Sequence, residues 1–363
     1  MICKKCVMDD VADPFISFDS EGISNYWHDA MQTKKLEYFP NEEGEKKLEQ
    51  QIALIKEKGK NKKYDCIIGL SGGLDSSYLA LLAKKHGLRM LGVHFNDGFD
   101  EPIGTENVKK ITEYCNIDLY DIPVDIDQYY SVIRAYLNAG VPNLAAPQDN
   151  LITSCILRIA RENGIKFFLS GVNFSLEGVL QKGNTITNRD KKNIIDIYRK
   201  CGEGGPISNL VFDSPFKRDM YYKVYGIKTC ALLNYIDYNM KRAIEELSSA
   251  CGFSYYGGKH YENRFTRFVQ QIWLVERFKV DKRKSHYSSL IASGQMTRDE
   301  ALALLIKPVI EDKERESIIC DLAKRLHLDE KYIIGLLNKH GVQHDVFKTS
   351  RYLSFKKAIK TII

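Results

Sequence analysis

The sequence predicts an α/β fold in which a doubly wound parallel sheet precedes a mainly helical C-terminal region. Two observations predict it: short apolar runs alternate with longer segments of helical spacing, and this alternation fades beyond about Tyr221. Strands that alternate with helices favour a parallel sheet covered on both faces. The four predicted strands lie in "DCIIGLS" (65–71), "LRMLGVHF" (88–95), "DLYDIPV" (118–124) and "KFFLSGV" (166–172).

Apolar spacing predicts the other elements of the 363-residue chain. Residues 1–30 lack a clear period, which favours a small, turn-rich segment. Leu48, Ile52 and Ile55 recur at helical spacing within 45–58 and predict an amphipathic helix that ends near Gly59. Further helices are predicted at 239–251, 263–277, 297–305 and 311–326. We therefore expect three parts: an N-terminal segment with one helix (1–60), an α/β domain (61–225) and a mainly helical region (226–363).

Composition narrows the class of protein. The net charge of +6 is modest, and Lys and Arg are interleaved with Asp and Glu, which favours an anionic small molecule over a nucleic-acid surface. No apolar run is long enough to span a membrane, and the N-terminus "MICKKCVMDD" has charges where a signal peptide needs apolar residues. The nine scattered cysteines favour reduced thiols. We expect a cytoplasmic protein without a membrane partner.

The turn "SGGLDSS" (71–77) predicts a phosphate site. It follows the first predicted strand and opens a helix, so backbone N–H groups and the helix dipole favour an anion there. Gly72 and Gly73 allow close approach to the backbone, and further donors are the hydroxyls of Ser71, Ser76 and Ser77. The Walker A and dinucleotide motifs are both absent. The alternative is an ordinary turn in which Asp75 caps the helix.

The same turn resembles the signature of the PP-loop ATP pyrophosphatases, a superfamily that includes asparagine synthetase, NAD synthetase and tRNA thiolation enzymes. The resemblance implies that ATP is split into AMP and pyrophosphate to adenylate an oxygen, and that a nitrogen or sulfur nucleophile displaces AMP. It implies Mg²⁺ shared between phosphates and a carboxylate such as Asp75. It assigns nucleotide binding to Gly69, Leu70, Ser71, Gly72, Gly73, Asp75, Ser76, Ser77, His94, Phe95, Asn96 and Gly171.

A closer resemblance rests on "CKKCVMDDVADPFISFDSEGISNY", "YDCIIGLSGGLDSSYLALL", "PQDN", "GVN", "YYGGKHYENRFTRFVQ" and "DKRKSHYSSLIASGQMTRDEAL". These segments resemble the N-acetyl sugar amidotransferases of bacterial surface-polysaccharide and nonulosonate pathways. Members of that family convert an acetamido group on a sugar into an acetamidino group with ammonia from a separate glutaminase. The resemblance therefore implies ATP and Mg²⁺ as cofactors, a glutaminase partner and an acetamido sugar substrate, and it makes 61–225 the ATP-binding domain.

Two polar residues are expected to lie near neighbouring strand ends. Asp149 and Asn173 are candidates to face the adenylated carbon, and Asp149 joins Asp75 as a candidate catalytic residue. A capping Asp and a turn Asn are the alternatives that position alone leaves open.

The segment "GGKHYENRFTRF" (257–268) gathers polar side chains behind two glycines. If it opens a helix, His260, Arg264 and Arg267 share one face, which could bind phosphates or a carboxylate or present His260 as the proton acceptor for attacking ammonium. Candidate substrate-binding residues are Asn173, Lys259, His260, Glu262, Arg264 and Arg267. The alternative is a helix face that is exposed to solvent. The charge run 279–287 likewise could contact an anionic substrate or be a solvated face.

Cys3 and Cys6 have the spacing of half a zinc ribbon, so they are candidate zinc ligands. The resembling family supplies a second Cys-x-x-Cys downstream, where this sequence has Ser24 and Trp27. His28 or a distant cysteine could complete a site, but we favour a metal-free remnant.

Two other functions stay open at this point. A tRNA-thiolating enzyme would need catalytic cysteines near the strand ends, and Cys155 and Cys201 are candidates although neither lies in a Cys-x-x-Cys. A non-catalytic nucleotide-binding module could keep the fold, but it would not need the complete glycine turn that this sequence has. No glutaminase signature is recognisable in the chain, so we expect ammonia to come from a partner.

Overall fold

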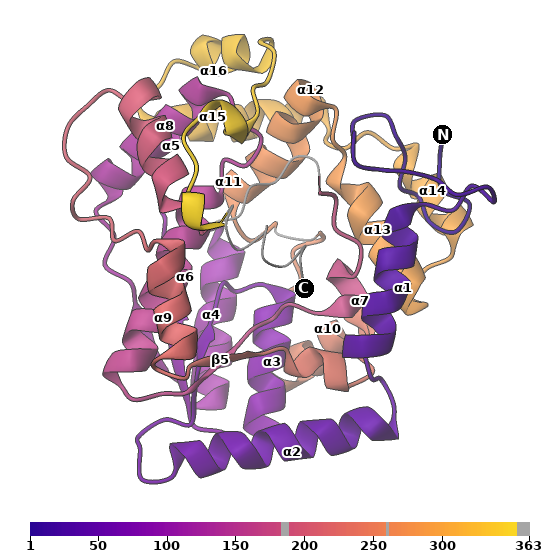
Figure 1. Cartoon of the computed structure of the whole chain (residues 1–363), viewed down its shortest axis with the longest axis vertical. Coiled ribbons are helices and arrows are strands. Elements are labelled where there is room, and N and C mark those ends of the chain that lie inside the picture. Colours follow the sequence, from indigo (N-terminus) through magenta and orange to yellow (C-terminus); the bar gives the residue numbers. More distant parts are fainter. Residues whose placement is uncertain (183–188, 259–260, 354–363) are drawn as a thin grey trace.

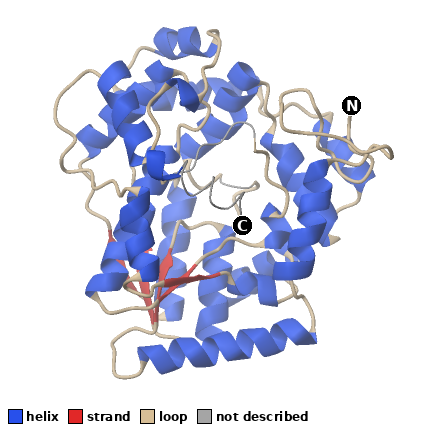
Figure 2. Cartoon of the chain, in the orientation of Figure 1, coloured by secondary structure: helices blue, strands red, loops and turns tan. Residues whose placement is uncertain are grey.

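A five-stranded parallel sheet lies at the centre of the α/β part in the computed structural model, which describes residues 1–182, 189–258 and 261–353. The strands are β1 (Cys66–Gly69), β2 (Met90–His94), β3 (Asp118–Asp121), β4 (Phe167–Leu169) and β5 (Lys228–Cys230), in the order β3-β2-β1-β4-β5. Figure 2 shows the strands confined to one end of the molecule and surrounded by helices. The predicted doubly wound sheet and its four predicted strands are confirmed.

Helices cover both faces of the sheet. Alternate residues of β1 point to opposite faces, so neighbouring residues of this strand pack against different helices. Cys66 and Ile68 belong to an apolar cluster with the helices α2 (Glu42–Gly59) and α3 (Leu74–Lys85), whereas Ile67 belongs to one with α5 (Ile126–Ala139) and α6 (Ala146–Glu162). Figure 1 shows where these helices lie. On this scaffold the helices are α2 (Glu42–Gly59), α3 (Leu74–Lys85), α4 (Pro102–Cys115), α5 (Ile126–Ala139), α6 (Ala146–Glu162), α7 (Phe174–Glu177), α8 (Lys191–Cys201) and α9 (Pro215–Lys223). The predicted helix at 45–58 is confirmed by α2.

The prediction that strands fade beyond about Tyr221 is wrong at β5. This strand pairs in parallel with β4, with Lys228 opposite Phe167 and Cys230 opposite Leu169. It has three residues, two of which are exposed, so no apolar alternation marks it in the sequence.

The region after β5 is mainly helical, as predicted. Its elements are η1 (Leu232–Tyr235), α10 (Met240–Cys251), α11 (Arg264–Arg267), the π-helix η2 (Phe268–Trp273), α12 (Leu274–Phe278), α13 (Lys282–Ser293), α14 (Arg298–Leu305), α15 (Asp312–Leu326), α16 (Glu330–Leu337) and η3 (His344–Val346). Two of these, α13 and α16, were not predicted, because α13 begins within the charge run 279–287 and α16 is short.

The N-terminal segment is partly helical, so the expectation of a turn-rich segment over 1–30 is wrong at its end. Helix α1 (Asn25–Glu37) begins after Ser24, whose hydroxyl accepts a hydrogen bond from Trp27 N at 3.3 Å. Ser24 therefore acts as the N-cap of α1. The segment packs with α7 and α13 in a third apolar cluster that contains Cys3 and Cys6.

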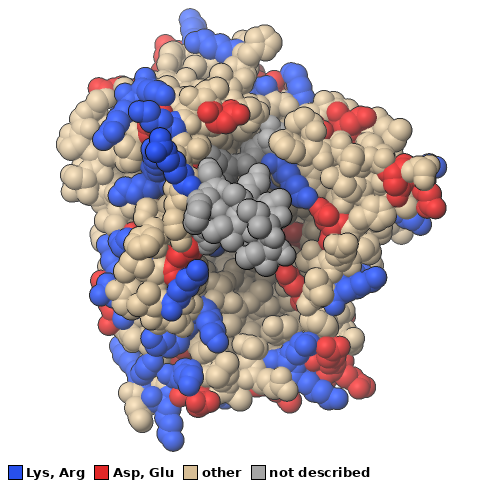
Figure 3. Space-filling model, viewed as in Figure 1, with Lys and Arg blue, Asp and Glu red and all other residues tan. Residues whose placement is uncertain are grey.

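Charge is mixed on the surface. On the face shown in Figure 3, Lys and Arg side chains are most numerous on the side of α5, α8 and α9, with Asp and Glu among them. Within the described residues, no helix combines the length and the apolar character needed to cross a lipid bilayer.

The order of the strands fixes where loops meet. Strand β1 lies between β2 and β4 and pairs in parallel with both. The loops that follow β1 and β4 therefore lie together at the carboxyl edge of the sheet. In the first of these loops Gly72 has φ +74°, and a Cβ there would lie 2.1 Å from the Gly104 carbonyl oxygen. Only glycine fits this conformation and this contact.

We expect Gly72→Ala to lower the free energy of unfolding by at least about 2 kcal/mol, because left-handed strain of roughly 1–2 kcal/mol is joined by a steric overlap. Gly204→Ala is the matched control, since Gly204 also has positive φ but no atom within 4 Å of the added Cβ. Urea unfolding measures both variants. Equal losses of stability would show that the contact with Gly104 relaxes without cost.

Candidate active site

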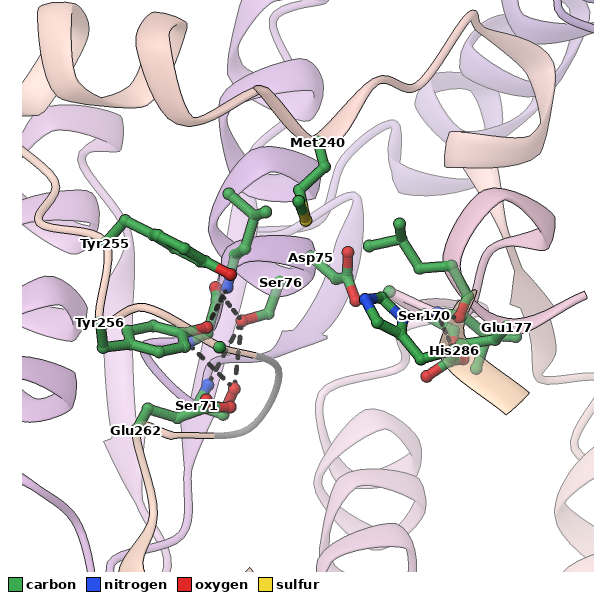
Figure 4. A pocket seen from close by; sticks show the side chains of 16 residues that line it. Ser71, Asp75, Ser76, Ser170, Glu177, Met240, Tyr255, Tyr256, Glu262 and His286 are labelled. Atoms are coloured by element: carbon green, nitrogen blue, oxygen red, sulfur yellow. Dashed lines mark hydrogen bonds between the residues drawn. The ribbon is translucent and has the colours of Figure 1, made fainter. Parts of the chain in front are cut away.

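A cavity of about 230 Å³ opens at the carboxyl edge of the sheet. The loop after β1 contributes Ser71 and Gly73 to its wall, the first turn of α3 contributes Asp75 and Ser76, and the loop after β4 contributes 170–172. Figure 4 shows Tyr255, Tyr256 and Glu262 on one side and Glu177 and His286 on the other, with Asp75 between them. The remaining lining residues are Leu74, Leu176, Met240 and Gly258.

Hydroxyl groups organise the loop at the start of α3. Gly73 N donates to the Ser71 hydroxyl at 3.2 Å, and the Ser76 hydroxyl donates to the Gly73 carbonyl oxygen at 3.2 Å. The Ser71 and Ser76 hydroxyls lie 3.4 Å apart. The backbone and two hydroxyls therefore surround the positive end of the α3 dipole, which favours an anion such as phosphate.

Asp75 is oriented by a buried tyrosine. The Tyr238 hydroxyl donates to Asp75 Oδ1 at 2.6 Å, and Tyr238 is almost fully buried. Burial, followed by the negative charge of Asp75, raises the pKa of Tyr238 well above its ordinary value. Tyr238 therefore stays protonated and holds the carboxylate in place at the first turn of α3.

Two side chains from the segment before α11 lie over the start of α3. The Tyr256 hydroxyl accepts a hydrogen bond from Leu74 N at 2.9 Å. Glu262 is 5% exposed, and its Oε1 lies 2.7 Å from the point that a Cβ on Gly73 would occupy. A buried carboxylate thus lies against the glycine turn in the place where an anion would approach it.

A second cavity of about 410 Å³ adjoins the first. The two share Leu176, Glu177, Met240, Tyr255, Gly258 and His286 as lining residues. The rest of the second cavity is lined by aliphatic side chains such as Leu180 and Leu290 and by aromatic and polar ones such as Tyr261, Gln271 and Lys282. An apolar wall with a few polar groups is typical of a small-molecule site, and the shared residues make one continuous site of two cavities.

Two known families match different parts of the chain, and both parts contribute residues to the site. Residues 65–172 match the asparagine synthase family, and residues 262–360 match the family described as "LPS biosynthesis protein WbpG-like, C-terminal domain". The first match contains the glycine turn, and the second contributes Gln271, Lys282, His286 and other residues to the second cavity. Together the two matches support an N-acetyl sugar amidotransferase-like member of the PP-loop family.

Curated relatives of this PP-loop protein match only in part. The tRNA-specific 2-thiouridylase MnmA of Lactobacillus helveticus is 34% identical over 86 residues, which cover 22% of this chain and 23% of that protein. The 7-cyano-7-deazaguanine synthase of Nitratiruptor sp. is 29% identical over 118 residues, 29% of this chain and 54% of that protein. The chain thus spans about a quarter to a half of the length of these relatives.

Two solved structures are similar at low identity. The NH3-dependent NAD synthetase from Campylobacter jejuni has a TM-score of 0.30 and 20% identity, and covers 43% of this chain and 72% of that chain. The NMN synthetase from Francisella tularensis has a TM-score of 0.31 and 15% identity, and covers 56% of this chain and 95% of that chain.

Of the residues that the sequence assigned to the site, some line the first cavity and others do not. Those that line it are Ser71, Gly73, Asp75, Ser76, Gly171 and Glu262. Gly69, Leu70, Gly72 and Ser77 are not among the lining residues. Ser77 in particular is fully buried, so its hydroxyl does not face the cavity as a phosphate donor would.

Three residues assigned to nucleotide binding line neither cavity: His94, Phe95 and Asn96. Phe95 packs edge-on against Tyr129 in the apolar core. His94 is 7% exposed, donates from Nδ1 to the Leu70 carbonyl oxygen at 2.8 Å, and has Nε2 3.3 Å from Asp100 Oδ2. Asn96 is exposed, and its Oδ1 accepts from Gly98 N.

Asn173 is a helix cap: it is buried, and its side chain accepts a hydrogen bond from Leu176 N at 2.9 Å. This is the turn role that position alone had left open. Asp149 lies in the first turn of α6, where its charge acts on Tyr129 and Arg218. Neither residue is among those lining the cavities.

The arginines predicted to bind substrate lie against α15. Arg264 pairs with Glu101 at 2.7 Å and with Asp321 at 3.4 Å, and Arg267 pairs with Glu314. Neither lines a cavity. Lys259 and His260 lie outside the described residues.

Several lining residues escaped the sequence assignments, chiefly Glu177, Tyr255, Tyr256 and His286. The signal for three of them was present, because "YYGGKH" and "KSHY" belong to segments that carry the family resemblance. Residue types alone did not tell which side chains of these segments turn toward the glycine loop.

The N-terminal cysteines lie together in the interior. Cys3 Sγ accepts from Ser24 N at 3.3 Å, and Cys6 Sγ lies 3.8 Å from the Ser24 hydroxyl. Hydrogen bonding to Cys6 lowers the pKa of Cys3 below its ordinary value. Across the described residues, His, Cys, Asp and Glu form no group of three or more that could hold a metal ion.

We expect Glu262→Gln to bind ATP about tenfold more tightly in EDTA, because the substitution removes a negative charge from the path of the phosphates; tenfold corresponds to about 1.4 kcal/mol. Isothermal titration calorimetry measures the affinity. Glu246→Gln, on α10 outside both cavities, is the matched control. Unchanged or weaker binding in EDTA would contradict the prediction.

A second prediction concerns stability and Asp97, which lies at the carboxyl end of β2. Asp97 is fully buried and accepts from Asn263 Nδ2 at 3.0 Å and from Gln148 Nε2 at 2.6 Å. Burial and the nearby charge of Asp100 raise the pKa of Asp97 to about 7. The folded chain therefore keeps a proton that the unfolded chain releases near pH 4.

The contribution of Asp97 to the free energy of unfolding should therefore fall as the pH rises from about 4 to about 7 and stay constant above. Urea unfolding of the wild type and Asp97→Asn across this range isolates the contribution as a difference. A difference that does not change with pH, or that grows toward pH 7, would contradict the assignment.

Proposed function

We propose that the protein is an ATP-dependent amidotransferase that adenylates the acetamido oxygen of an N-acetyl sugar and replaces it with ammonia. One observation carries the proposal: the cavity at the glycine turn continues into a second cavity that is walled by the WbpG-like region. Members of the PP-loop family are ATP-dependent ligases and synthetases. The two cavities would let a nucleotide and a sugar meet beside Asp75 and His286.

The chemistry needs this arrangement. An amide carbonyl is a poor electrophile, so its oxygen must become part of a leaving group before a nitrogen can replace it. Ser71, Gly73 and Ser76 would bind the pyrophosphate through the loop backbone and hydroxyls. Asp75 and Glu262 offer carboxylate oxygens, the ligand type that Mg²⁺ prefers, and the bound ion would neutralise charge on the phosphates.

Product analysis tests the reaction. We expect ATP, ammonium and a panel of UDP- and CMP-linked acetamido sugars to give AMP, pyrophosphate and a sugar in which O is exchanged for NH, detected by mass spectrometry. Asp75→Asn should lower turnover at least about 100-fold without unfolding the protein. Asp299→Asn, in the exposed first turn of α14, is the matched control. ADP and orthophosphate as the substrate-dependent products would refute the proposal.

The ammonia source is part of the proposal. Ammonium is protonated and non-nucleophilic near neutral pH, so turnover with ammonium alone should rise with pH. Glutamine should support turnover only after a glutaminase subunit is added, and we propose the helical C-terminal region as its docking surface. Efficient use of glutamine by the purified chain would overturn the need for a partner.

The alternative of tRNA thiolation has less support. Cys155 is buried and Cys201 lies on α8, and neither is among the residues that line the cavities. A thiolation mechanism would need a cysteine sulfur near the activated atom.

A further inference from the structure

His286 lies where the two cavities meet. It lines both of them, and among the described lining residues it is the one imidazole. Figure 4 shows its ring and the Asp75 carboxylate turned toward the same part of the first cavity. A group shared by both cavities is placed where a nucleotide-activated atom and an incoming nucleophile would meet.

The ring has a defined tautomer. His286 Nδ1 lies 3.4 Å from the Leu176 carbonyl oxygen, a long hydrogen bond in which only the nitrogen can donate. With Nδ1 as the donor of this bond, proton transfer by the ring falls to Nε2. Imidazole is the side chain that most often transfers protons in enzyme reactions.

The helix that presents His286 is held on two sides. Ser289 accepts from Val179 N at 2.9 Å, next to α7, and Ser288 accepts from Val7 N at 3.2 Å in the N-terminal segment. Both serines are buried. These bonds fix α13 against the wall of the site, so the position of His286 is set by the scaffold rather than by a loop.

We propose that His286 is the catalytic base that takes a proton from the attacking nitrogen during amination, a role that rests on the proposed function. Ammonia attacks the carbon of the adenylated amide, so a C–N bond forms and the nitrogen becomes positively charged. His286 Nε2 accepts one N–H proton. The C–O bond to AMP then breaks, AMP leaves with the former amide oxygen, and the product is the amidine. His286 afterwards releases the proton to solvent.

Two substitutions separate this role from a structural one. His286→Asn places an amide nitrogen close to the position of Nδ1, so it can keep the bond to Leu176 while removing the proton acceptor. His286→Gln places its amide near Nε2, where it can bind but cannot accept a proton at neutral pH. His28→Asn is the matched control, because His28 is an exposed histidine of α1 that pairs with Asp19.

Two assays on the full chain then test the proposal with the acetamido sugar nucleotide that gives AMP in the product analysis. Sugar-dependent exchange of pyrophosphate into ATP reports adenylation, and ammonium-dependent amidine formation reports the second step. We expect both His286 variants to keep exchange within about twofold, to lose amination by about 100-fold or more, and to recover part of the amination when imidazole is added.

Three results would overturn the role of His286. Normal amination in His286→Asn would show that no base is needed there. Equal loss of exchange and amination would show a structural role. Absence of sugar-dependent AMP formation in the wild type across the whole panel would remove the proposed function together with this inference, whereas the first two results leave the proposed function standing.

Discussion

The parallel pairing of β1 with β4 is the constraint on which the site depends. Ile67 lies opposite Phe168 and Ile68 opposite Leu169, so the two strands end at the same level of the sheet. The glycine turn and the loop 170–172 therefore leave side by side, and Gly171 lies against Asp75. A shift of one residue in this register would turn every β1 side chain to the opposite face and separate the two loops.

The C-terminal region completes the site through buried polar contacts with the α/β part. Tyr256 bonds to the first turn of α3, and Asn263 donates to Asp97 and to Asp100. Such groups are costly to bury without partners, so the segment before α11 is held to the carboxyl edge of the sheet. The two regions that match different families thus form one continuous site because their polar groups satisfy one another.

Acidic side chains line the first cavity, and their charge affects which ligands can bind there. Asp75, Glu177 and Glu262 line the first cavity, whereas Arg264 and Arg267 are paired with acidic residues away from it. A phosphate chain entering this cavity meets helix-terminus N–H groups and hydroxyls, but it also meets carboxylates. A divalent cation would relieve that repulsion, which agrees with the oxygen ligands available. His286 adds an imidazole, which is either neutral or positively charged and so does not add to the negative charge.

The sequence by itself determined the sheet, the glycine turn and the helical character of the C-terminal region, because periodicity and the conformational needs of glycine are local properties of the chain. It did not reveal β5, which is too short and exposed to leave a pattern. Only the tertiary structure decided which polar residues face the cavities. His94 and Asn173 form buried bonds, and Glu262 and His286 reach the cavity walls, because these orientations depend on contacts between segments far apart in the chain.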